Sequence, residues 1–256
     1  ETPFKPDIIT SAYGINDFFR KPREDNLADT QAYYTALRAA FPNTKIYCIS
    51  PIWTALLTGK ENAEKRVFLY SIYDKIAAEQ GAITRCYGIG GTRLARQLKP
   101  SEWPRHDLDF PSRVAEMDPD ADLVVVFGGT NDFGHGDAPF GDFSDRTAET
   151  FCGALHELYV SLLEKFPEAT IMVMTPLHRS TEAIPNMHGK VLKDYVDMIR
   201  RAAEYYSLPV LDLYATYGVQ PAVPVMKDTF MPDGLHPNDA GHVILTNKIA
   251  QFIKNL

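Results

Sequence analysis

The sequence lacks the features that would place the chain in a membrane, in a disulfide-stapled fold or on nucleic acid. Its 256 residues include three cysteines, whose spacing fits neither a zinc site nor a set of disulfides. No apolar stretch approaches the roughly 18 residues that a spanning helix needs. Lys and Arg number 26 against 33 Asp and Glu, and the net charge of −7 argues against a nucleic-acid-binding face. We therefore expect no membrane span and no nucleic-acid partner.

The cysteines also bear on the compartment. Cys48, Cys86 and Cys152 each lie in an apolar setting, which is typical of buried thiols in a reducing environment. This predicts a cytoplasmic protein. The chain begins with Glu1 instead of Met, so a removed signal peptide stays open as an alternative.

The residues that are present predict one α/β domain over 1–256. Apolar residues make up 45% of the chain and charged residues 23%, as in ordinary globular proteins. Strand-like and helix-like segments alternate, which favours a parallel sheet covered by helices. Strands are expected at 7–13, 45–50, 83–87, 122–127, 170–175 and 209–213. Helices are expected at 27–40, 62–80, 147–165, 191–206 and about 240–255.

A turn near the C-terminus carries the strongest chemical signal. Asp233 and His236 are three residues apart, in a Gly- and Pro-rich turn before the last expected helix. This spacing lets a carboxylate hold one imidazole nitrogen while the other nitrogen faces a substrate, as in the base and orienting residue of a nucleophilic triad. The alternative is a capped helix start with two surface residues.

Two further motifs each follow an expected strand. Asn131, in Gly128-Gly129-Thr130-Asn131-Asp132, is predicted to project at the carboxyl edge of the sheet, where ligands bind in open α/β folds. Its amide could donate a hydrogen bond to an oxyanion, or it could be an ordinary turn residue. Gly90-Gly91 follows another strand, and there the backbone N–H of Gly91 can approach a ligand closely.

An internal repeat complicates the domain organisation. Asn16-Asp17 follows a strand-like segment that resembles the one before Asn131-Asp132, and Phe41-Pro42 corresponds in the same way to Phe166-Pro167. The second copy carries an insertion at 134–143 with His135 and Asp137, which we expect to be a solvated loop, with a substrate-contacting loop as the alternative. Residues 1–82 thus form a partial repeat of a strand–helix module, and 83–256 carry the candidate site.

Together these motifs resemble the SGNH (GDSL-like) hydrolase family. Gly90-Gly91 is similar to its second block, Gly128-Gly129-Thr130-Asn131-Asp132 to its third and Asp233-Gly234-Leu235-His236 to its fifth. The resemblance implies a flavodoxin-like three-layer α/β/α sandwich with a mostly parallel sheet of five or six strands. It also implies ester hydrolysis without a metal or cofactor. His236 would be the base, Asp233 its orienting residue, and Gly91 and Asn131 the oxyanion donors.

The chain departs from the family at the nucleophile. The first block, Gly-Asp-Ser, is absent from the sequence, so the serine has to be sought elsewhere. Ser50 ends an expected strand well before Gly91 and is the first candidate. Ser71, after the apolar segment 66–70, is the second. An incomplete triad is the third interpretation.

The resemblance therefore predicts a hydrolase of small carboxylic esters with short acyl or acetyl groups. The alternative is a catalytically impaired SGNH-fold protein that binds a ligand or a carbohydrate. Because both copies of the repeat are incomplete, a homo-oligomer or strand-swapped assembly is a further expectation.

Overall fold

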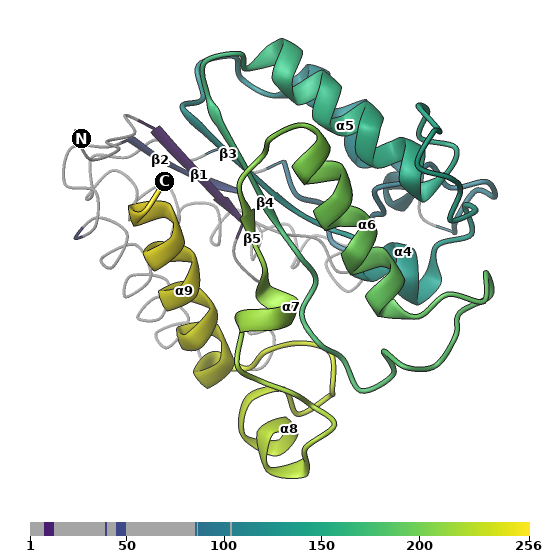
Figure 1. The fold of residues 1–256 in the computed structure, drawn as a ribbon, viewed down its shortest axis with the longest axis vertical. Coiled ribbons are helices and arrows are strands. Elements are labelled where there is room, and N and C mark those ends of the chain that lie inside the picture. The colour runs from purple at the N-terminus through teal and green to yellow at the C-terminus, as the bar shows by residue number, and fades with distance from the viewer. Residues whose placement is uncertain (1–7, 13–38, 40–44, 50–84, 86, 103) are drawn as a thin grey trace, which may run out of the picture.

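The chain folds around parallel strands (Figure 1). The computed structural model describes residues 8–12, 39, 45–49, 85, 87–102 and 104–256. Within these residues, β1 pairs with β2, and β4 lies between β3 and β5, all in parallel. β1 also lies beside β3. The strand bounds are β1 Ile8–Ala12, β2 Lys45–Ile49, β3 Leu123–Phe127, β4 Thr170–Met174 and β5 Val210–Leu211.

The central strands are apolar on both faces because both are covered. Val124 of β3 and Ile171 of β4 are register partners that belong to the main core together with residues of the flanking helices. The alternate residues Leu123 and Met172, which point to the opposite face, are also fully buried. A parallel sheet with helices on both sides has this pattern, so the expected three-layer α/β/α fold is confirmed.

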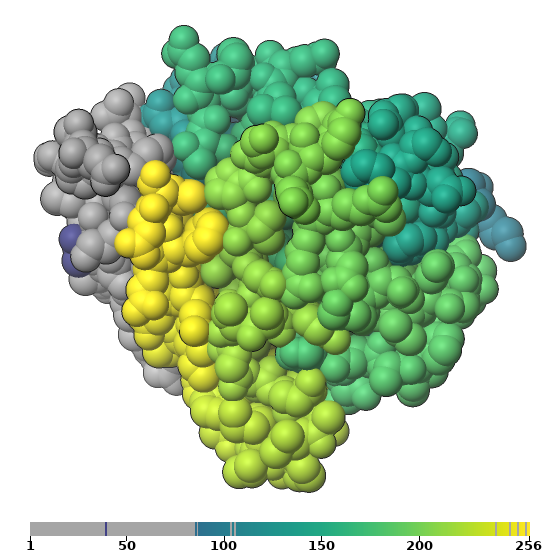
Figure 2. Space-filling view, viewed as in Figure 1, coloured from purple at the N-terminus to yellow at the C-terminus, as the bar shows by residue number. Residues whose placement is uncertain are grey.

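Long helices supply most of the remaining core. Helix α5 (Phe151–Lys165) packs against α6 (Leu192–Tyr205). The last helix, α9 (Asp239–Lys254), lies at the surface on the face shown in Figure 2, where it is yellow. The Thr150 hydroxyl caps α5 by accepting the Gly153 N–H. Across the described residues, no helix combines the length and apolar character needed to cross a membrane. The shorter helices are η3 Pro104–Asp107, α3 Phe110–Arg113, η4 Val114–Glu116, α4 Thr130–His135, α7 Leu213–Thr216 and α8 Pro224–Phe230.

Most expected elements that fall on described residues are confirmed within a few residues, and two need correction. Arg85 and Tyr87, in the expected strand 83–87, have no strand structure. The expected strand 209–213 is shortened to Val210–Leu211, because the Asp212 side chain accepts the Ala215 N–H and starts α7. The helices expected at 27–40 and 62–80 lie outside the described residues, apart from residue 39.

Candidate functional site

Asp233 and His236 form a close pair in the turn before α9. The Nδ1 atom of His236 lies 2.7 Å from the Asp233 Oδ2 atom. Asp233 Oδ1 also accepts the backbone N–H groups of Leu235, at 2.9 Å, and His236, at 2.7 Å. The Nε2 atom of His236 has no hydrogen-bond partner among the described residues, and the side chain is 44% exposed. The imidazole is therefore fixed at one nitrogen and accessible at the other.

The environment of Asp233 keeps its carboxylate charged. Partial burial by itself would raise the pKa, but the hydrogen bonds from the backbone and imidazole of His236 and from the Leu235 N–H outweigh it. The pKa of Asp233 consequently lies below its ordinary value. A carboxylate that is ionised at neutral pH can hold the imidazole in one tautomer and stabilise its protonated form.

The loop after β4 supports this turn. Gly234 has a positive φ of 74°, and a side chain here would collide with Ser180. The Ser180 N–H donates to the Gly234 carbonyl at 2.8 Å. The neighbouring Arg179 donates to the Thr130 carbonyl at 3.2 Å, directly before Asn131. Residues 179–180 thus connect the turn to the start of α4.

Asn131 lies in the first turn of α4 and not in the open turn that its sequence context also allowed. Its Nδ2 atom donates to the Thr92 carbonyl at 3.0 Å. An amide nitrogen carries two hydrogens, so one N–H is left for a ligand. This hydrogen bond brings the Asn131 motif against the Gly90-Gly91 motif, as expected from the strand order.

Gly91 adopts a backbone conformation that few other residues accept. Its φ is +83°, and the turn is closed by the Thr92 N–H donating to the Ile89 carbonyl at 3.2 Å. The Gly91 N–H has no hydrogen-bond partner among the described residues. Gly91 and Asn131 therefore each offer an N–H donor from segments that contact each other.

A buried arginine, Arg93, supports the Gly91 turn through a hydrogen bond. Arg93 is 4% exposed, and its guanidinium donates to the carbonyls of His106, at 2.8 Å, and Gly91, at 3.4 Å. It also lies 3.0 Å from Nδ1 of His135 and 3.7 Å from Asp107. Burial, followed by the Arg93 charge, lowers the pKa of His135. Although its ring lies beside Arg93, His135 is an exposed residue and ends α4, so a helix end replaces the loop expected at this position.

Sequence reasoning missed the structural importance of Asp132. Its buried carboxylate accepts the N–H groups of Leu94, at 3.0 Å, and Ala95, at 2.9 Å. These bonds tie α4 to the segment that follows the Gly91 turn. Burial raises the pKa of Asp132 to about 6, although the two backbone hydrogen bonds oppose the shift. The signal in the sequence was its position at the end of the Gly-Gly-Thr-Asn-Asp motif.

The raised pKa predicts how stability depends on pH. The folded state binds the Asp132 proton more tightly than the unfolded chain, so this group lowers the free energy of unfolding as pH rises from about 4 to about 6. Asp132→Asn cannot titrate. We expect the stability difference, wild type minus variant, to fall by about 2 kcal/mol over that window in urea unfolding. A difference that stays constant or grows with pH would contradict the assignment.

The other residues singled out from the sequence are not part of this arrangement of described residues. Ser50 and Ser71 lie outside the described residues, so the structure does not place a nucleophile. Asp137 accepts the N–H groups of Leu98 and Lys99, both at 2.9 Å, and so has a structural partner. Cys152 is buried as expected, and burial raises its thiol pKa to about 12. Within the described part of the chain, no cluster of His, Cys, Asp or Glu could hold a metal ion.

Comparison with known proteins identifies the family. The sequence model of the GDSL-like lipase/acylhydrolase family matches residues 69–244. A GDSL lipase of Mycobacterium tuberculosis is 28% identical over 145 residues, which make up 57% of this chain and 54% of that protein. The chain thus spans about half the length of this curated relative.

Solved structures show a similar fold. A protein from Lactobacillus plantarum is 29% identical, with a TM-score of 0.60 over 71% of this chain and 86% of that one. A possible lipase from Chitinophaga pinensis is 17% identical and shares the fold, with a TM-score of 0.53 over 96% of this chain and 97% of that one. The family match covers well over half of the sequence and includes all three motifs. The chain belongs to the GDSL-like lipase/acylhydrolase family.

Proposed function

We propose that the chain hydrolyses small carboxylic esters at the site formed by Asp233, His236, Asn131 and Gly91. The observation that carries the proposal is the 2.7 Å contact between Asp233 and His236, which leaves the other imidazole nitrogen accessible. Family membership supports ester chemistry, and no step of the proposed reaction requires a cofactor.

In the proposed reaction, Nε2 of His236 accepts the proton of a serine hydroxyl while the serine oxygen attacks the ester carbonyl. The carbonyl oxygen becomes an oxyanion that accepts hydrogen bonds from the Gly91 N–H and the free Asn131 amide N–H. Collapse of the tetrahedral intermediate breaks the bond to the alcohol, which leaves with the proton from His236. Water then hydrolyses the acyl-enzyme by the same steps and regenerates the serine.

Ser50 is our candidate for the nucleophile. It comes directly after β2, and polar groups that follow parallel strands gather at the carboxyl edge of a sheet. Ser71 is the second candidate.

We further propose that residues 83–256 carry the site and that 1–82 complete the domain as a partial repeat of its strand–helix module. If the missing segment of each copy is supplied by another chain, the assembly is a strand-swapped oligomer.

The substrate class follows from the exposure of the site. His236 lies in an open turn, and an ester with a short acyl or acetyl group needs little more than access to the imidazole and the oxyanion donors.

A fluorophosphonate probe tests the proposal, because it reacts covalently with an activated serine. We expect labelling of the native chain at one serine, mapped by mass spectrometry to Ser50, and strong loss of labelling in His236→Ala. Heat-denatured protein is the control for nonspecific reaction. Labelling at Ser71 would replace Ser50 but keep the mechanism. No labelling together with no turnover of p-nitrophenyl acetate would contradict it and favour the alternative, a catalytically impaired protein that binds a ligand or carbohydrate.

A further inference from the structure

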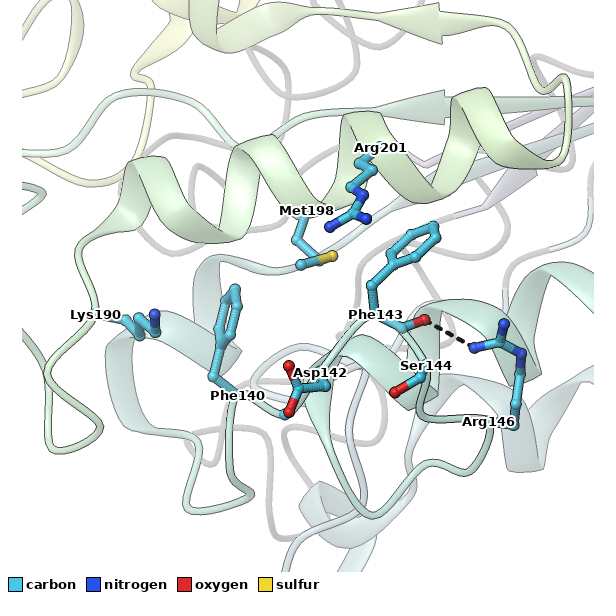
Figure 3. A pocket seen from close by; sticks show the side chains of 9 residues that line it. Phe140, Asp142, Phe143, Ser144, Arg146, Lys190, Met198 and Arg201 are labelled. Carbon is cyan, nitrogen blue, oxygen red and sulfur yellow. Dashed lines mark hydrogen bonds between the residues drawn. The ribbon is translucent and has the colours of Figure 1, made fainter.

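A polar hollow lies between the loop before α5 and one side of α6 (Figure 3). Its volume is about 590 Å³, and it shares no residue with the candidate active site. In the figure, Met198 and Arg201 descend from the helix, while Phe140 and Phe143 point up toward it from the loop. The residues that line this hollow take no part in the proposed ester hydrolysis.

Three cationic groups around the hollow are held in place by uncharged partners. The Lys190 Nζ atom lies 4.9 Å from the ring centre of Phe140. The Arg201 guanidinium lies 3.9 Å from the ring centre of Phe143. The Arg146 guanidinium donates to the Phe143 and Asp145 carbonyls, both at 2.8 Å. Cation–π contacts and hydrogen bonds to carbonyls restrain these groups without neutralising their charge.

None of the three cations has a carboxylate within ion-pair distance in the described part of the chain. Asp142 is the single carboxylate among the residues lining the hollow, against three positive charges. Other cations of α6 behave differently, since Lys193 and Arg200 both pair with Asp197. In a chain with a net charge of −7, this local excess of unpaired positive charge favours an anionic ligand.

An adjoining hollow suggests what else the ligand carries. Its volume is about 240 Å³, and it shares Phe140, Met198 and Arg201 with the larger one. Asp194 and Asp197 line it instead of further cations. Carboxylates accept hydrogen bonds from hydroxyl groups. The two hollows together therefore match an anionic group at one end of a ligand and hydroxyl groups at the other.

We propose that this paired hollow binds an anionic sugar, with its phosphate or carboxylate near Arg146, Lys190 and Arg201 and its hydroxyl groups toward Asp194, which has no ion pair in the described part of the chain. The site is separate from the proposed ester-hydrolysing centre, so its occupancy does not depend on the nucleophile. The phosphate and the carboxylate are the two forms of the anion that the cations can recognise, and guanidinium groups bind both.

Isothermal titration calorimetry of the full chain tests the site with three probes: glucose 6-phosphate, glucuronate and glucose. We expect at least one anionic probe to bind, binding to weaken with added salt, and glucose not to bind. Arg146→Gln, Lys190→Gln and Arg201→Gln should each weaken binding about tenfold. Lys99→Gln removes an exposed positive charge that lines neither hollow and should bind like the wild type.

The outcomes separate the two anions and can overturn the proposal. Binding of one anionic probe alone identifies the recognised group. Three single substitutions guard against a misfolded variant, and each is checked by its melting temperature. Absence of binding by both anionic probes up to about 10 mM, a concentration that covers even weak sites, would overturn the proposal. So would wild-type affinity in all three correctly folded variants. Turnover of p-nitrophenyl acetate by these variants reports separately on the hydrolytic site.

Discussion

His236→Ala is expected to lower kcat/KM for p-nitrophenyl acetate by about 10³–10⁴-fold. The imidazole is the group proposed to take the serine proton, and alanine leaves none at this position. The Asp233 carboxylate would keep its hydrogen bonds from the backbone N–H groups of Leu235 and His236, so the turn should retain its shape. The loss is measured by steady-state kinetics and should fall mainly on kcat.

Two further variants test whether the loss is specific to the Asp233–His236 pair. Asp233→Asn keeps the shape of the side chain but removes the charge that orients the imidazole, and should reduce kcat by about 10²–10⁴-fold. Asp228→Asn removes an exposed carboxylate from the nearby helix α8 and should leave kcat within about twofold of the wild type, as surface changes usually do. Full activity in His236→Ala would eliminate the proposed base.

The fold could be predicted from the sequence where burial controls the pattern. The run Leu123–Phe127 is apolar on both faces, which is the signature of a strand covered on both sides, and β3 has these bounds. Short helices escaped prediction because they depend on one local contact and not on periodicity. Helix α7 begins where the Asp212 side chain accepts a backbone N–H. An Asp within a strand-like segment does not by itself predict such a capping contact.

The candidate site was predicted in part. The spacing of Asp233 and His236 specifies a contact within one turn, and that contact is present. The interactions that join distant motifs were not predictable, because they cross long sequence separations. The Arg179 contact with the Thr130 carbonyl and the Asp132 contacts with residues 94–95 are examples. Both depend on how the loops after β3 and β4 fold over the sheet edge.

Asn131→Ala is expected to lower kcat by about 10²–10³-fold, with little change in KM. In the proposed mechanism, the second amide N–H bonds to the oxyanion, which exists in the transition state and not in the bound ester. Removing it raises the energy of the transition state alone. Asn131→Asp should be at least as damaging, since a carboxylate provides no N–H donor and repels the negative oxygen.

A structural effect of Asn131 has to be separated from a chemical one, because its amide also donates to the Thr92 carbonyl at 3.0 Å. Asn186 is a structural control: its amide donates to the Phe133 carbonyl of α4 at 3.3 Å and to the Tyr195 hydroxyl at 2.8 Å, and its Oδ1 atom accepts two further backbone N–H groups. If Asn131 acts on the oxyanion, Asn186→Ala should lower the melting temperature at least as much as Asn131→Ala yet keep kcat within about threefold, a loss of under 1 kcal/mol. Equal losses of kcat in both variants would assign Asn131 to the scaffold and leave the Gly91 N–H as the remaining oxyanion donor.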